Sequence, residues 1–278
     1  MKRILLFRYH HQFERNRELL RFQQFLNPGV KIYGMYGGPT ENLQQANDIL
    51  GDVLEHNYLL QHPNPDWNWK NSDMSFQVWY RDYGHQLDFS VMHVLEWDLL
   101  YFEPLEKLFA NVPENALGLT GLIPLKRIEK IWYWTRKPEK REELMQLMEF
   151  FKKEFEYIQE PYGILGPGTT LPRNFLESIR YINIPDLGND ELRIPLLAQV
   201  CGFKLVDTGF YRKWFSKSEF RYFNSNAFVI KLKTMEKQLK REKGRRVFHP
   251  CNQNFTHEEL LKMQELTKLN RKNFIFYL

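Results

Sequence analysis

The feature that most constrains this chain is the alternation of apolar and amphipathic segments over its first 60 residues. An apolar run over Lys2–Phe7 predicts a buried strand, and a helical pattern follows over Glu14–Leu26. A second strand is predicted over Val30–Tyr36, a helix begins near Thr40, and a weaker strand is predicted over Asp52–Leu60. Strands that alternate with helices through short turns indicate an α/β fold with a mostly parallel central sheet flanked by helices.

The rest of the chain continues the pattern without an evident linker. Further strands are predicted over Val91–Leu95, Leu117–Ile123, Lys130–Trp134 and Lys204–Asp207. Helices are predicted over Ser72–Leu87, Glu139–Phe155 and Arg173–Ile179, after Asn189, and after a capping box of Thr256 and Glu259. The segment Tyr162–Pro172, with three glycines and two prolines, is predicted to be a loop. We therefore expect one domain over residues 1–278.

Composition bears on where in the cell the protein is expected. No run of about 18 apolar residues is present, so no segment is expected to span a membrane. The apolar stretch at the N-terminus is too short for a secretory signal, and two cysteines form no disulfide framework. A cytoplasmic protein is expected, with a peripheral position at the inner face of a membrane as a further expectation.

Positive charge is concentrated near the C-terminus. Residues 231–246 hold eight Lys/Arg and two Glu, a net of +6 (8 − 2), whereas the whole chain carries +5. Such a cluster suits RNA, an anionic membrane surface or a phosphorylated substrate. An ordinary solvated helix and loop would explain it equally well.

The triplet Glu96-Trp97-Asp98 directly follows the apolar run Val91–Leu95. Carboxylates at positions i and i+2 of a strand point to the same face, and ligands of open α/β sheets bind beyond the carboxyl ends of the strands. Hard oxygen ligands of this kind suit Mg²⁺ or Mn²⁺ that bridges to a diphosphate. Two acids that end a strand can also simply be reaching solvent.

The stretch VMHVLEWDLLYFEPLEKLF resembles the acid-x-acid motif of GT-A fold glycosyltransferases and its usual continuation. The resemblance implies a single Rossmann-like domain in which Asp98 binds Mn²⁺ or Mg²⁺ and so holds the diphosphate of a nucleotide-sugar. Glu96 takes the first-acid position, next to the ribose or the metal. The chain departs from the family by having Glu rather than Asp there. The implied division is a nucleotide-sugar half over 1–125, an acceptor half over 126–230 and a basic helical extension over 231–278.

Two later segments resemble the family in their order. In LGNDELRIPLLAQVCGFKL, Asp190 or Glu191 would take the place of the base that deprotonates the acceptor in inverting members, although both acids also suit a helix N-terminus. In RVFHP, His249 stands where a further metal ligand is expected. Imidazole suits Mn²⁺ better than Mg²⁺.

The nucleotide is expected to contact residues near the ends of the first strands. By position these are Arg8 and Tyr9, with Asp52 as a contact for the base or ribose. The family's usual Asp-Asp-Gly-Ser after the second strand is replaced by Tyr-Gly-Gly-Pro. The Gly-rich segment from Gly163 to Gly168 is expected to border the acceptor.

These observations predict a metal-dependent glycosyltransferase, inverting by expectation, that moves a sugar from a nucleoside-diphosphate sugar to a hydroxyl of a glycan or lipid-linked acceptor. A nucleotidyltransferase is one alternative, although the chain has no glycine in Arg8–His11 where such enzymes carry a Gly-rich loop. The other alternative is a non-catalytic protein that binds RNA or an anionic membrane through residues 231–246. Nucleic acid is not an expected partner of the enzyme.

Overall fold

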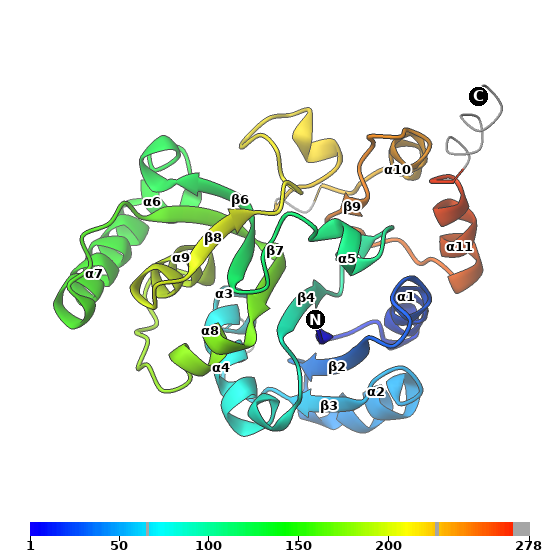
Figure 1. Ribbon diagram of the computed structural model, residues 1–278, viewed down its shortest axis with the longest axis horizontal. Helices are drawn as coiled ribbons and strands as arrows, with labels where there is room; N and C mark the ends of the chain where they lie inside the picture. The colour runs from blue at the N-terminus through cyan, green and yellow to red at the C-terminus, as the bar shows by residue number, and fades with distance from the viewer. Residues whose placement is uncertain (65–66, 226–227, 269–278) are drawn as a thin grey trace.

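The computed structural model describes residues 1–64, 67–225 and 228–268, and it confirms the expected α/β fold (Figure 1). Seven strands form the central sheet: β1 (Arg3–Tyr9), β2 (Lys31–Tyr36), β3 (His56–Leu59), β4 (Val91–Glu96), β6 (Ala116–Pro124), β7 (Tyr162–Pro172) and β8 (Lys204–Asp207). A second, antiparallel sheet pairs β5 (Leu100–Tyr101) with β9 (Val247–Phe248).

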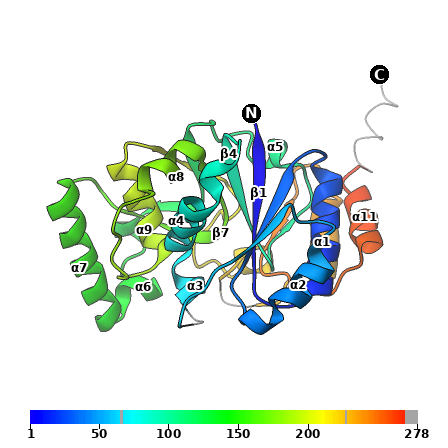
Figure 2. The same ribbon diagram turned by 90° about the horizontal axis from the view of Figure 1, so that it is seen from below.

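Helices flank the central sheet (Figure 2). They are α1 (Phe13–Leu26), α2 (Leu43–Leu50), α3 (Trp67–Lys70), α4 (Ser72–Asp82), α5 (Leu105–Leu108), α6 (Tyr133–Arg136), α7 (Pro138–Phe155), α8 (Arg173–Ile179), α9 (Asp190–Val200), α10 (Leu232–Leu239) and α11 (His257–Glu265). The helix α11 begins with the expected capping box of Thr256 and Glu259.

Two cores cover the two faces of the sheet. Along β1, Ile4 and Leu6 belong to one apolar cluster, together with α4, α7, α8 and α9. Leu5 and Phe7 belong to the other, together with α1, α2 and α11. This alternation follows from the two-residue period of a strand, and it explains why β1 is apolar at almost every position.

The strand order is β3-β2-β1-β4-β7-β6-β8. The strands β3, β2, β1 and β4 run parallel to one another, β8 is parallel to β6, and β7 is antiparallel to both β4 and β6. The chain moves outward from β1 to β3 and then returns to the other side of β1 as β4. The carboxyl ends of β1 and β4 therefore lie at the point where the order reverses, which is where open α/β sheets bind ligands.

The expectation of a loop over Tyr162–Pro172 was wrong, because this segment is β7, a central strand. Its register with β6 jumps from Gly118–Thr170 to Thr120–Leu165, so the residues between Leu165 and Thr170 form an irregular bulge. The turn-forming residues Gly166, Pro167 and Gly168 lie in that bulge, where proline and glycine are tolerated within a sheet.

Two other segments also differ from expectation. Lys130–Trp134 is not a strand, since it leads into the short helix α6. A short apolar run does not distinguish strand from helix when no neighbouring strand is known. The third strand is shorter than expected and starts at His56, so Asp52 lies in the turn after α2. Of the expected extension over 231–278, residues 269–278 lie outside the described residues.

In the part of the chain that the structure describes, no helix is long and apolar enough to cross a membrane. The strands β4 and β7, which come from the two halves expected from the sequence, pair directly in one sheet. The whole sheet is therefore built as one unit.

A buried ion pair joins α4 to α9. The guanidinium of Arg193 donates two hydrogen bonds of 2.8 Å to the carboxylate of Asp73, and the two side chains are 0% and 1% exposed. Arg193 also donates to the backbone oxygen of Leu187 (2.8 Å) and to the side chain of Asn71 (2.5 Å). These bonds satisfy the buried charge and fix the first turn of α9.

We expect Arg193→Leu to lower the free energy of unfolding by about 3–5 kcal/mol, because it leaves the Asp73 carboxylate buried without its cation. Urea denaturation measures the change. Arg17→Leu is the matched control, since its partner Asp52 lies at the surface with a side chain 41% exposed. A loss no larger than that of the control would contradict the structural role of the pair.

Candidate functional site

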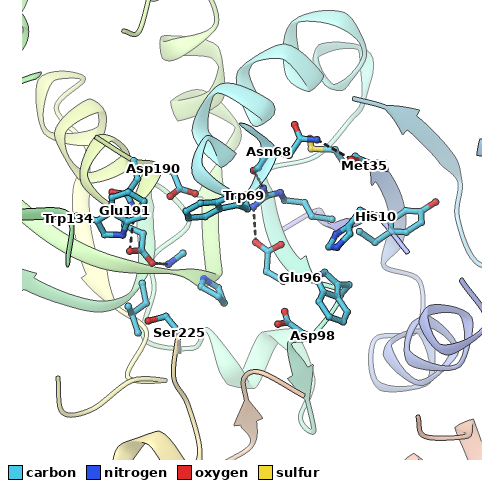
Figure 3. Close-up of a pocket in the computed structure, with 18 of the residues that line it drawn as sticks. His10, Met35, Asn68, Trp69, Glu96, Asp98, Trp134, Asp190, Glu191 and Ser225 are labelled. Atoms are coloured by element: carbon cyan, nitrogen blue, oxygen red, sulfur yellow. Dashed lines mark hydrogen bonds and ion pairs between the residues drawn. The ribbon is translucent and has the colours of Figure 1, made fainter. Parts of the chain in front are cut away.

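A cleft with a volume of about 1390 Å³ lies at the carboxyl ends of β1, β2 and β4. Its lining includes residues of both halves expected from the sequence: Arg8, Tyr9, Gly37, Glu96 and Asp98 on one side, and Gly166, Asp190 and Glu191 on the other. Figure 3 shows Glu96 and Asp98 apart from Asp190 and Glu191, with Trp69 between the two sets. The cleft therefore has two chemically different ends.

Arg8 and Glu96 form an ion pair at the end of the sheet. The register of β1 and β4 places the two residues opposite each other, and Arg8 Nη1 lies 3.0 Å from Glu96 Oε1. Arg8 Nη2 also donates to the backbone oxygen of Asn68 at 2.6 Å. Burial raises the pKa of Glu96, and the nearby guanidinium offsets only part of that rise. The carboxylate of Glu96 is thus already paired with the guanidinium of Arg8.

Asp98 pairs with a different residue, His249, whose Nε2 lies 3.3 Å from Asp98 Oδ1. Burial alone would raise the pKa of Asp98, but the charge and hydrogen bond of His249 hold it below its ordinary value. Burial likewise lowers the pKa of His249, and Asp98 more than compensates, so the net shift is upward. The two side chains are only 16% and 9% exposed.

The backbone explains why His249 lies next to Asp98. Cys251 N donates to Asp98 O at 2.7 Å, and the β5–β9 pairing holds the same two segments together. His249 Nδ1 lies 2.7 Å from the backbone oxygen of Asn224. A carbonyl acceptor at Nδ1 favours a proton on that nitrogen, so Nε2, which faces Asp98, is the nitrogen that could bind a cation. The donor set of Asp98 and His249 therefore fits a divalent cation that completes its shell with ligand oxygens.

Glu96 is less suited to be a direct ligand than Asp98, because Arg8 already occupies its carboxylate. Among the described residues, no group of three or more His, Cys, Asp or Glu side chains is arranged to hold a metal ion. A cation at this place would have two protein ligands, which is the usual situation where substrate phosphates supply others.

At the other end of the cleft, Asp190 and Glu191 begin α9. Asp190 Oδ2 accepts hydrogen bonds from the backbone N (3.3 Å) and the hydroxyl of Ser72. Glu191 accepts from Gly166 N at 3.0 Å and from Asn189 Nδ2 at 3.3 Å. The bulge of β7 thus supplies the donor that holds Glu191, and Gly166 and Pro167 of the Gly-rich segment line the cleft.

The two carboxyl groups have strongly perturbed acidities. Burial and the Asp73 carboxylate raise the pKa of Asp190 to about 6, against the opposing effects of Ser72, Arg8 and Arg193. Burial and Asp190 raise the pKa of Glu191 to about 8. Because both acidities are weakened, the buried pair resists carrying two negative charges. Groups poised near neutral pH in a cleft are typical of acid–base sites.

Of the two residues expected to contact the nucleotide, Tyr9 lies at the cleft and Asp52 does not. Tyr9 lines the cleft, but it is 3% exposed and its ring stacks 5.1 Å from Phe7. Asp52 does not line the cleft, and it pairs with Arg17 at 2.7 Å and with Arg21 at 2.9 Å. The expectation for Asp52 was wrong because it precedes its strand, whereas the cleft lies at the carboxyl ends.

Several residues that shape the cleft were not predicted as site residues. Ser72 and Asn68 come from a segment predicted only as a helix and its approach, and they contact Asp190 and Arg8 across the cleft. Trp69 and Trp134 form part of an aromatic wall, with ring centroids 5.8 Å apart. These contacts join segments far apart in the chain, so no local pattern could have indicated them.

Several side chains of the basic segment 231–246 are packed into the fold rather than exposed to solvent. Met235 and Leu239 of α10 are fully buried. Arg245 is 9% exposed and donates to Glu219 and to the backbone oxygen of Phe210, each at 2.6 Å. Part of the positive charge of this segment is therefore used inside the fold.

Comparison with known proteins identifies no family: no family model and no curated protein matches the chain. The function has to be argued from the cleft itself.

We expect Glu191→Gln to become increasingly stabilising as the pH rises. The folded pKa of Glu191 is raised from about 4.5 to about 8, so the wild type loses stability as the pH rises through this window and the group must ionise in a buried site. Glutamine still accepts from Gly166 N but has no proton to lose. Urea unfolding at pH 5 and pH 9 measures the difference, and a difference independent of pH would contradict it.

Proposed function

We propose that this protein is a glycosyltransferase that moves a sugar from a nucleoside-diphosphate sugar to an acceptor hydroxyl, with a divalent cation, Mn²⁺ or Mg²⁺, as cofactor. The observation that carries the proposal is that one cleft is lined by Asp98, which pairs with His249 behind it, and by the buried carboxyl groups of Asp190 and Glu191. One end suits a diphosphate and its cation, and the other suits removal of a proton.

The donor would lie along the carboxyl ends of β1, β2 and β4. Arg8 Nη1 donates a hydrogen bond to Glu96, and the Arg8 guanidinium lies 5.4 Å from the centre of the Phe76 ring. The Arg8 side chain is therefore held in position before a ligand binds. Gly37 and Gly38 allow a ligand to approach the backbone after β2. Asp98 and His249 would hold the cation, which when bound neutralises negative charge on the departing diphosphate.

The acceptor hydroxyl would be deprotonated by Asp190. In an inverting reaction, the acceptor oxygen forms a bond to the anomeric carbon while the bond from that carbon to the diphosphate oxygen breaks. The proton of the hydroxyl passes to the Asp190 carboxylate. A pKa of about 6 leaves this group ionised near neutral pH yet more basic than an ordinary aspartate. Burial and the charge of Asp190 also raise the pKa of Glu191, so the pair does not readily carry two negative charges.

The aromatic wall supports a carbohydrate ligand. Trp69, Trp134 and Trp214 line the cleft and present ring faces or edges to it. Trp214 Nε1 donates to the backbone oxygen of Gly121 at 2.7 Å, which fixes its orientation. Rings with one fixed polar end suit ligands that have both an apolar face and hydroxyl groups. A cytoplasmic location is part of this proposal, since nucleotide-sugars are its substrates.

We expect Asp98→Asn to abolish the metal-dependent binding of the donor. A screen of UDP-, GDP-, CMP- and dTDP-sugars should find one that raises the melting temperature of the parent only with Mn²⁺ or Mg²⁺, because a ligand of the folded state stabilises it by mass action. Asp52→Asn is the matched control, since Asp52 lies outside the cleft. An Asp98→Asn protein that retains the full metal-dependent shift would sink the assignment of this site.

We expect Asp190→Asn to separate binding from chemistry. The amide still accepts from Ser72 but cannot take a proton, so the donor-induced thermal shift should persist while transfer falls by a factor on the order of 100 or more. Release of nucleoside diphosphate in the presence of acceptor sugars measures transfer. Full turnover by this variant would exclude Asp190 as the base.

A further inference from the structure

Exposed apolar side chains gather around the mouth of the cleft. The described residues include twelve large hydrophobic side chains that are exposed, and four of them, Trp69, Ile131, Tyr133 and Phe215, line the cleft. Three more, Phe228, Val229 and Leu232, follow Ser225, which also lines it. Seven of the twelve therefore lie in segments that reach the cleft. We call these seven residues the apolar rim.

Ring contacts join the segments that carry the rim. Trp132 and Trp214 meet edge to face with centroids 5.5 Å apart, which connects the segment before α6 to the loop after β8. Trp69 and Trp134 connect α3 to α6 at 5.8 Å (Figure 3). Phe228 stacks on the cleft-lining Phe220 at 6.1 Å. These contacts connect the segment of Trp69 to that of Tyr133, the segment of Tyr133 to that of Phe215, and Phe228 to a residue that lines the cleft.

Exposed cations surround the apolar rim. Residues 127–137 expose four and residues 212–233 expose six: Arg127, Lys130, Arg136, Lys137, Arg212, Lys213, Lys217, Arg221, Lys231 and Lys233. The same two ranges contain two acids, of which only Glu129 is exposed. Glu219 is buried and paired with Arg245 at 2.6 Å. Within these two ranges, ten positive charges and one negative charge are exposed.

From this combination we infer that the apolar rim and its cations dock the protein on an anionic phospholipid bilayer. Aromatic and branched side chains flanked by Lys and Arg are the composition of surfaces that lie in the membrane interface. The apolar side chains enter the headgroup region, and the cations meet the phosphates of anionic lipids. An exposed apolar surface of this kind would otherwise be costly in water.

This surface differs from the segment 231–246 that the sequence suggested. The start of that segment, Lys231–Lys233, belongs to the rim and its cations, whereas Met235, Leu239 and Arg245 are buried in the fold. The docking surface depends on residues 127–137 and 212–233, which come together only in the folded protein. The inference requires no particular reaction in the cleft, so it stands apart from the proposed function.

Sedimentation with vesicles tests the inference in the absence of any nucleotide-sugar. The full chain should bind vesicles that contain phosphatidylglycerol and phosphatidylcholine, should bind phosphatidylcholine alone far more weakly, and should dissociate as salt is raised. The double substitution Phe228→Asp with Val229→Asp should weaken binding at least about tenfold, because it removes two rim side chains and adds repulsive charge. Neither residue lines the cleft.

A matched control uses the exposed residue Ile158, which is 92% exposed and lies after α7, away from the cleft lining. Ile158→Asp should bind vesicles as the parent does, and circular dichroism should show that all variants are folded. The inference is overturned if the parent does not bind anionic vesicles, if the control weakens binding as much as the rim variant, or if the protein binds single-stranded RNA in their place.

Discussion

The parallel pairing of β1 with β4 is the constraint on which the cleft depends. Its register places Arg8 opposite Glu96 at the carboxyl end of both strands. A buried carboxylate is costly unless it is paired, and Arg8 provides that pairing. Asp98, two residues further on, lies beyond the end of β4 and is left to His249. The two acids of the triplet therefore differ in role. Glu96 forms a structural pair with Arg8, whereas Asp98 forms with His249 a pair that is suited to a cation.

The opposite end of the cleft depends on a second buried interaction, between Arg193 and Asp73. This pair anchors the first turn of α9 against α4, and Ser72, the neighbour of Asp73, then donates to Asp190. The negative charge of Asp73 also contributes to the raised pKa of Asp190. One structural ion pair therefore sets both the position and the acidity of the proposed base. Such coupling makes the stability of α9 and the chemistry of the cleft hard to separate without variants that conserve shape.

Local sequence patterns predicted those strands and helices in which apolar periodicity and turn residues agree. The strands β1, β2 and β4 and the helix α9 are recognisable because apolar periodicity and turn residues agree with the final structure. The strand β7 was missed because its hydrogen bonds to two neighbours outweigh the turn propensity of its Gly and Pro residues. That error hid the fact that Gly166 N, at the bulge, holds Glu191.

The site was predictable in its parts but not in its assembly. Chain order and the resemblance to GT-A enzymes suggested Asp98, Asp190, Glu191 and His249. The first three line one cleft, and His249 contacts Asp98. Their partners were not predictable, because Ser72 and Arg193 act on residues more than a hundred positions away. The expected nucleotide contact of Asp52 does not agree with the structure for a geometric reason. Asp52 precedes β3, whereas the cleft lies at the carboxyl ends of the strands.

The apolar rim reaches both ends of the cleft. Tyr133 and Phe215 line the cleft. Phe228 N donates to Asn224 Oδ1, and the backbone oxygen of Asn224 lies 2.7 Å from His249 Nδ1. If the rim meets a bilayer, the mouth of the cleft would therefore face the headgroups. An acceptor that is itself held by a lipid would then be presented at this mouth, so the membrane inference favours a lipid-linked acceptor over a free glycan.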